Sequence, residues 1–256
     1  MSSIEKIVEA INVPKRIVDG AELFLRKLLG PAIIEEGQLI GDKIRYRRFK
    51  NQVTIFTKAK DLLESKSIDP KTINLKLLVP LIEYSSLEED EKMQLTWAQV
   101  IANIASYDSE QIFNLRCIEI LKEITPNEIL LLDRLYLDFK DKEKELLEKW
   151  KSNERLKNRT EITPDYAVFS PWKFETELGI SNQLIALYTD RLLSFGIIRY
   201  EQPELSESTE RIRVDTSSML SEPHSVEIKS YELESSDRVH FTNFGLYFVK
   251  LCKFNS

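Results

Sequence analysis

Apolar residues recur at three- and four-residue spacing along the first 150 positions of the chain, with short polar or proline-containing breaks between runs. This spacing indicates amphipathic helices, which bury one face and expose the other. It predicts that the chain begins as a series of helices. They cover residues 4–11, 16–29, about 32–65, 77–84, 86–106, 111–124 and 127–150.

The acidic run 88–91 has a structural interpretation. Ser86 followed by Glu89 fits a capping box, and acids are favoured in the first turn of a helix by its dipole. We therefore interpret the run as the start of the helix that carries Met93 and Trp97, in preference to an acidic binding site.

Beyond residue 150 the pattern changes. The segment 151–172 is polar and contains two prolines, and two helices are predicted after it, closed by Gly179 and Gly196. Alternation of apolar and polar residues predicts strands at 197–201, 224–233 and 237–242. A stretch rich in Ser and Glu, 204–223, separates the first two strands, and a helix at 244–252 follows the last. This order matches a winged helix-turn-helix.

The predicted fold class is therefore mainly α, with an N-terminal helical domain followed by a degenerate winged helix-turn-helix with a small β-hairpin. We place the domains at 1–108 and 109–256. The second domain has polar insertions near 151–172 and 204–223.

Composition favours a protein of the reducing cytosol. The 256 residues include only two cysteines, which do not make a disulfide framework. No signal peptide is recognisable, and no run of about 18 uncharged apolar residues is present to span a membrane. The net charge of −6 argues against general attraction to nucleic acid or anionic lipid. We expect a cytoplasmic protein.

One stretch departs from the acidic average. Seven of the twenty residues from Gly41 to Lys60 are Lys or Arg. On a helix most of them form a solvated face opposite Phe49. Arg45 and Arg48 lean toward the apolar side, where an arginine usually pairs with a carboxylate. Asp42, Glu35 and the run 88–91 are candidate partners, so we predict structural or interface roles for both arginines.

Motifs for catalysis and cofactor binding are scarce. Neither glycine-rich phosphate loop occurs, no His/Cys cluster has metal spacing, and His224 and His240 have no recognisable relay partner. We expect no enzyme activity, cofactor or metal. One alternative stays open: Asp215, Glu227 and Lys229 imitate the D…E-x-K pattern of metal-dependent nucleases.

Two further alternatives involve binding. A winged helix suggests a DNA-binding regulator, with Ser181, Asn182 and Gln183 at the start of the reading helix. Arg191 is the only cation in the rest of that helix, and glutamates crowd the wing, so nucleic acid is disfavoured as a partner but left open. The apolar helical segment from Arg16 to Ile40 leaves a membrane-active effector open, although Glu22, Glu35 and Glu36 interrupt its insertion face.

Several motifs, in this order, resemble the abortive infection alpha family. The matching positions are Gly30 and Pro31, Arg48 and Asn51, Pro80 and Leu81, Ser86 to Asp90, Trp97, Ala98 and Asn103, and Thr125, Pro126 and Glu128. The chain departs from the pattern at Gln99, where the family has Asn. The resemblance is good over about the first 135 residues and looser beyond them.

The resemblance implies a bacterial protein of phage defence, in which an infected cell stops growing or dies before phage progeny mature. It brings no catalytic residues. We predict that the chain acts through contacts with a protein partner or with itself. The predicted interface residues are Asp42, Arg45, Arg48, Asn51 and Trp97.

Overall fold

The computed structural model describes residues 15–29, 46–106, 111–152, 163–202, 204–214, 224–234 and 237–253. Over these residues the protein is mainly helical, as the sequence predicts, and it has two antiparallel strand pairs where the sequence predicts one small hairpin. The predicted helix 4–11 and the segment 32–45 lie outside the described residues.

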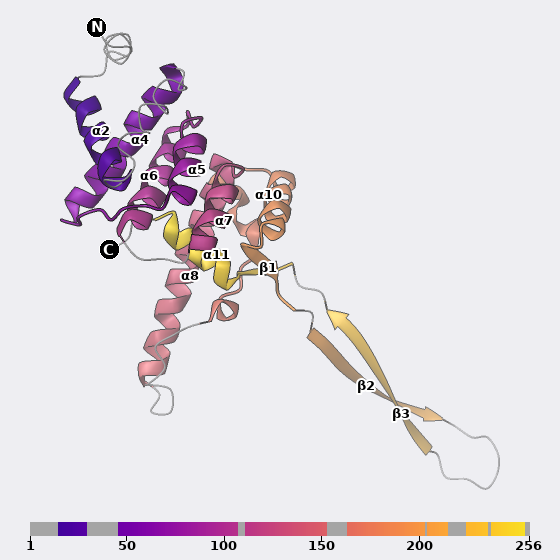
Figure 1. Cartoon of the computed structure of the whole chain (residues 1–256). Helices are drawn as coiled ribbons and strands as arrows, with labels where there is room; N and C mark the ends of the chain where they lie inside the picture. Colours follow the sequence, from indigo (N-terminus) through magenta and orange to yellow (C-terminus); the bar gives the residue numbers. More distant parts are fainter. Residues whose placement is uncertain are drawn as a thin grey trace, which may run out of the picture.

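Six helices form the first half of the described chain. They are α2 (Lys15–Leu29), α4 (Tyr46–Ser65), α5 (Leu75–Ser85), α6 (Glu91–Ser106), α7 (Gln111–Leu121) and α8 (Pro126–Ser152). Figure 1 shows α2, α4, α5 and α6 gathered at one end of the molecule, with α7 and α8 next to them. Their bounds agree with the predicted periodicity to within a few residues.

The start of α6 differs from the prediction. Ser86 is not its N-cap: it ends α5, and its hydroxyl donates to the Glu83 carbonyl. The cap is Asp90, whose Oδ1 accepts from the backbone N–H groups of Lys92 and Met93, each at 3.0 Å. The sequence offers several capping residues in a row. The tight turn after α5 selects the last of them.

The second half of the described chain contains shorter elements. Two 3-10 turns, η2 (Pro164–Tyr166) and η3 (Pro171–Phe174), precede α9 (Glu175–Leu178) and α10 (Asn182–Ser194). Strand β1 (Ile198–Tyr200), strands β2 (Glu204–Val214) and β3 (His224–Glu234), strand β4 (Val239–Phe241) and α11 (Asn243–Leu251) follow. The predicted polar insertion 204–223 forms strand β2 over its first eleven residues, which the sequence did not predict as a strand.

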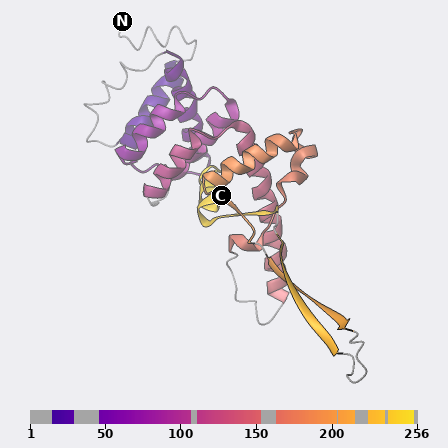
Figure 2. The ribbon, with the colours of Figure 1, turned by 90° about the vertical axis from the view of Figure 1, so that its right-hand side faces the viewer.

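The strands form one elongated hairpin with a break. Strand β1 pairs with β4, and β2 pairs with β3 in an unbroken register from Glu204 opposite Glu234 to Val214 opposite His224. Glu201 donates its backbone N–H to the Arg238 carbonyl between the two ladders. Figures 1 and 2 show the β2–β3 hairpin reaching out from the helical body, at the end opposite α2 and α4.

Most of the buried apolar residues form one cluster that runs from Ala21 in α2 to Cys252 after α11. Helix α6 lies at its centre, because its residues are buried nearly all round and Trp97 is only 1% exposed. On the other side, Phe241 of β4 packs edge-on against Phe139 of α8 and Phe169. The division into domains at residue 108 stays a prediction.

Helix α11 joins the two halves of the chain. Asn103 of α6 donates to the carbonyl groups of Leu251 and Lys253 at 2.8 and 3.1 Å. At the other end of α11, Thr242 caps the helix by accepting from the Gly245 N–H at 2.8 Å. A Cβ added at Gly245 would lie 1.8 Å from the Ile197 oxygen, so this contact requires glycine.

Candidate functional site

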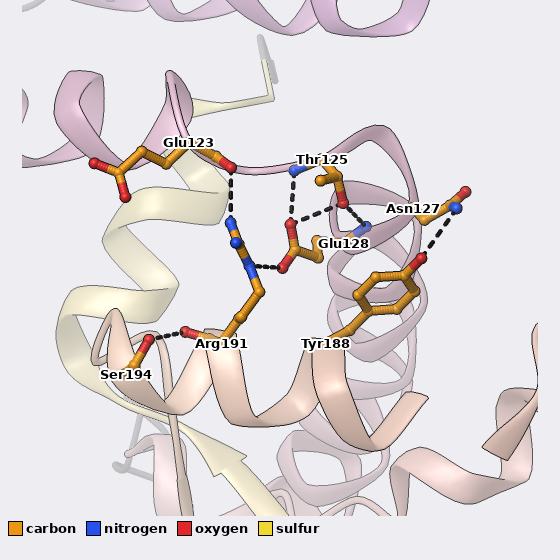
Figure 3. A network of polar contacts seen from close by, with 7 residues as sticks. All are labelled: Glu123, Thr125, Asn127, Glu128, Tyr188, Arg191 and Ser194. Carbon is orange, nitrogen blue, oxygen red and sulfur yellow. Dashed lines mark hydrogen bonds and ion pairs between the residues drawn. The ribbon is translucent and has the colours of Figure 1, made fainter. Parts of the chain in front are cut away.

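A polar network at the corner between α7 and α8 contains the most buried carboxylate of the described chain (Figure 3). Thr125 precedes Pro126, the first residue of α8, and Glu128 follows one turn later. Glu128 Oε2 accepts from the backbone N–H of Thr125 at 2.7 Å and from its hydroxyl at 2.8 Å. The motif Thr125-Pro126-x-Glu128 is therefore a reciprocal capping arrangement.

The second oxygen of Glu128 binds another part of the chain. Arg191 of α10 donates from Nε to Glu128 Oε1 at 2.5 Å and from Nη2 to the Glu123 carbonyl at 2.7 Å. Glu128 is completely buried, whereas the Arg191 side chain is 46% exposed. Nearby, Asn127 donates to the Tyr188 hydroxyl at 3.2 Å. Figure 3 shows how these contacts tie α10 to the start of α8.

The arrangement is structural, because the oxygens of Glu128 already accept hydrogen bonds from this chain. A carboxylate satisfied in this way is a poor acid or base for another molecule. Sequence reasoning did not identify the pairing. The available signals were the capping pattern at Glu128 and the isolated cation Arg191 on α10.

A second network connects α4 to the α5–α6 turn. Asn51 donates to the Ser86 carbonyl at 3.1 Å, and Gln52 donates to the Ile82 carbonyl at 3.1 Å. Gln94 of α6 donates to the Glu88 carbonyl at 3.0 Å and approaches Asn51 Oδ1 at 3.5 Å. The side chain of Asn51 therefore bridges elements of this chain, and its interface role remains a prediction.

Of the other predicted interface residues, the structure describes Arg48 and Trp97. Arg48 is exposed on α4. Trp97 of α6 is enclosed in the core. Trp97 therefore contributes packing and presents no surface to a partner in this conformation. Asp42 and Arg45 lie outside the described residues.

The nuclease alternative gains no support from the geometry. Asp215 lies outside the described residues, while Glu227 and Lys229 lie on β3, opposite Arg211 and Thr209. Within the described part of the chain, no group of three or more His, Cys, Asp or Glu residues is arranged to hold a metal ion. His240 is buried in β4 and accepts from Arg199 Nε at 3.0 Å.

Two of the polar residues considered for DNA reading are engaged within the chain. Asn182 at the start of α10 donates to Glu175 at 2.6 Å, and Arg191 is paired with Glu128. The apolar side of α2 faces the core through Ala21, Phe24 and Leu28. No described helix combines the length and apolar content needed to span a membrane.

Shifted pKa values reflect the fold. Burial raises the pKa of the Cys117 thiol to about 12 and that of Cys252 well above its ordinary value. Burial and the nearby Lys173 lower the pKa of Lys142, which donates to the Val168 carbonyl. A hydrogen bond with the Thr163 side chain lowers the pKa of Asp165. Buried thiols with raised pKa values are poor nucleophiles.

Comparison with known proteins identifies the family. A family model described as abortive infection alpha matches residues 45–252. The match includes the Arg48–Asn51 and Thr125–Glu128 motifs and extends through the hairpin to the end of α11, whereas Gly30 and Pro31 lie outside it. No curated protein and no solved structure matches the chain. Because the family model covers most of its length, the chain belongs to the abortive infection alpha family.

Proposed function

We propose that this protein acts in bacteriophage defence by abortive infection, and that it works by binding proteins rather than by catalysis. Membership of the abortive infection alpha family over residues 45–252 is the observation that carries the defence role. The cytoplasm, where phage replicate, is the proposed location.

The surface of the described helices supports binding to proteins. Ile112 at the start of α7 is 72% exposed, and Leu187 on α10 is 53% exposed with Leu184 one turn before it. Single exposed apolar side chains are common on any surface, but adjoining ones, such as Leu184 and Leu187 on α10, are typical of protein contacts. The polar groups of the network between α8 and α10, Glu128 and Arg191, are occupied in holding the fold.

The order α9, α10, β1, β2–β3 and β4 favours the description of this region as a degenerate winged helix-turn-helix. In that description α10 is the reading helix and the β2–β3 hairpin is an unusually long wing. The apolar residues on α10, and the use of Arg191 within the fold, favour a protein-contacting role over DNA reading. A salt-dependent mobility shift with duplex DNA would instead support a DNA-binding regulator.

Phage plating on a bacterial host with and without the gene tests the defence role. We expect reduced plating together with death of infected cells at high multiplicity of infection. A matched pair of variants tests the role of α10: Leu184→Lys with Leu187→Lys is expected to abolish protection, and Lys149→Glu on the exposed end of α8 to retain it. Unchanged plating across a broad phage panel would refute the proposal.

A further inference from the structure

A pocket of about 230 Å³ lies where α11 meets α6 and α8. Figure 1 shows α11 next to both of these helices. The walls of the pocket come from segments that are far apart in the sequence, so the pocket exists only once the chain has folded. Its apolar lining includes Leu95 of α6, Ile129 and Leu132 of α8, and Phe248 and Val249 of α11.

Contacts within the chain fix the walls of this pocket. Asn103 donates to the carbonyl groups of Leu251 and Lys253 at 2.8 and 3.1 Å and so holds the end of α11 against α6. Lys253 Nζ also lies 2.6 Å from Asp133 Oδ1 on α8, and both of these side chains line the pocket. A pocket that is formed in advance loses little freedom when an occupant enters it, which favours binding.

The volume of the pocket indicates the size of its occupant. Binding sites for small molecules and cofactors usually hold about 300–1,000 Å³, which is more than this pocket provides. One aromatic or branched side chain is of suitable size, and pockets of this kind receive the anchor side chains of protein interfaces. Leu95 is 42% exposed and Ile129 is half-buried, so the apolar lining continues onto the outer surface, where a partner protein can cover it.

The charged groups of the pocket favour an acidic partner. Lys92, Lys253 and Asp133 line it, which gives two cations against one acid. Lys253 and Asp133 pair with each other, whereas the exposed ammonium group of Lys92 has no ion pair among the described residues. The acidic run 88–91 precedes Lys92, but none of its residues lines the pocket. A carboxylate of a partner would therefore find an available cation at Lys92.

We propose that this pocket receives one bulky apolar side chain of a partner protein, and that an acidic residue beside that side chain binds Lys92. The apolar walls hold the anchor side chain, and the ammonium group selects partners with a neighbouring acid. This inference rests on the proposed action through protein contacts, and it adds a docking point on α6, α8 and α11 to the exposed face of α10.

Three synthetic peptides test the proposal on the full chain. The probe peptide is acetyl-Ala-Glu-Trp-Glu-Ala-amide; the Gln peptide replaces both glutamates by Gln, and the Ala peptide replaces Trp by Ala. Binding is measured from the methyl NMR signals of Leu95, Ile129 and Val249. We expect saturable shifts with the probe peptide, binding of the Gln peptide that is about threefold weaker at low salt, and no saturable shifts with the Ala peptide. Because the net charge of the chain is −6, general electrostatic attraction would favour the Gln peptide instead.

Two substitutions locate the binding. Lys92→Met, at an exposed position, should remove the difference between the probe peptide and the Gln peptide, whereas Lys76→Met on the exposed side of α5 should keep it. Gln99 is a half-buried residue that lines the pocket, so Gln99→Trp fills the space and should weaken binding of the probe peptide by about tenfold or more. Melting temperatures show whether each variant folds, and the comparison of Lys92→Met with Lys76→Met decides the proposal even if Gln99→Trp does not.

Several results would overturn the proposal: no saturable shifts, shifts away from the pocket, or an unchanged peptide preference in Lys92→Met. A small molecule that copurifies with the chain and displaces the probe peptide would also overturn it, because the occupant would then not be a protein. In cells that the wild-type chain protects, Gln99→Trp should abolish protection, and Gln202→Trp, at an exposed position outside the pocket, should retain it. Full protection by a folded Gln99→Trp chain would count against the pocket. Absence of protection by the wild-type chain would count against the defence role alone, because the peptide measurements do not involve phage.

Discussion

Replacing Glu128 by Gln isolates the contribution of the network between α8 and α10. The substitution keeps the size of the side chain but changes one carboxylate oxygen into an amide nitrogen, which donates. Both oxygens of Glu128 accept from donors: one from Thr125 and the other from Arg191 Nε. Whichever way the amide turns, it places a donor against a donor at a site that is completely buried.

The expected loss follows from the contacts. A hydrogen bond to a charged group contributes about 1.5–3 kcal/mol, and a buried donor without an acceptor costs about 1–3 kcal/mol. The half-exposed Arg191 can turn to water, which reduces the second term. We therefore expect Glu128→Gln to lower the free energy of unfolding by about 3 kcal/mol. Arg191→Met, which keeps an aliphatic stem, should lower it by about 2 kcal/mol.

Urea denaturation of both single variants and the double variant completes a double-mutant cycle. The double variant should be more stable than the sum of the two losses predicts, by about 1 kcal/mol or more, because the amide nitrogen then faces no guanidinium. Arg134→Met is a suitable control, since Arg134 and Glu177 are 3.6 Å apart on the surface and should contribute under about 0.5 kcal/mol. Additive losses, or a loss below about 1 kcal/mol for Glu128→Gln, would refute the reasoning.

Three other predictions concern stability and reactivity. Asn51→Ala should lower the free energy of unfolding by about 1–2 kcal/mol, because it removes the hydrogen bond to the Ser86 carbonyl. Arg48→Ala, at an exposed position, should change this free energy little. Equal effects of the two substitutions in thermal melts would argue against a stabilising role for the Asn51 contact. Gly245→Ala should destabilise the protein by about 3 kcal/mol or prevent folding, because the new Cβ would meet the Ile197 oxygen. Gly20→Ala in α2 has open space around it and should stabilise the protein by about 0.5–1 kcal/mol. Urea titrations measure both changes. Burial raises the pKa of Cys117 to about 12. The folded chain therefore keeps the thiol proton, whereas the unfolded chain releases it near pH 8.5. The free energy of unfolding should fall as the pH rises above about 8.5. Thiol labelling with a chromogenic disulfide should be slow in the native chain and fast in urea, and Cys117→Ala should reduce the alkaline loss of stability.

Periodicity predicted most helices because each of them covers the core along one stripe. Helices α4, α5 and α8 follow that rule, and their bounds agree with the prediction within two residues at the ends that are described. The N-cap of α6 was missed because Ser86 and Asp90 are both good caps. The turn after α5, which Asn51 and Gln94 hold in place, determines which of them is used.

Strand β2 was missed for a different reason. Its first half, ELSEST, has few apolar residues, so the sequence reads as a polar loop. Pairing with β3 imposes the strand, and such long-range pairing overrides weak local preference. The ion pair between Glu128 and Arg191 joins residues far apart in the chain. No local sequence pattern specifies which carboxylate Arg191 pairs with, so the pairing is visible only in the folded structure.

The contact of Asn103 with the end of α11 has a consequence for synthesis on the ribosome. Helix α11 emerges after all the other described helices, yet Leu246, Phe248 and Val249 complete the core that α6 and α8 begin. Until α11 emerges, the earlier helices carry an uncovered apolar surface of the kind that chaperones bind. A ribosome that stops before codon 243 therefore releases a chain that cannot close its core, and proteolysis removes such products readily. Synthesis of α11 thus acts as a checkpoint for closure of the core.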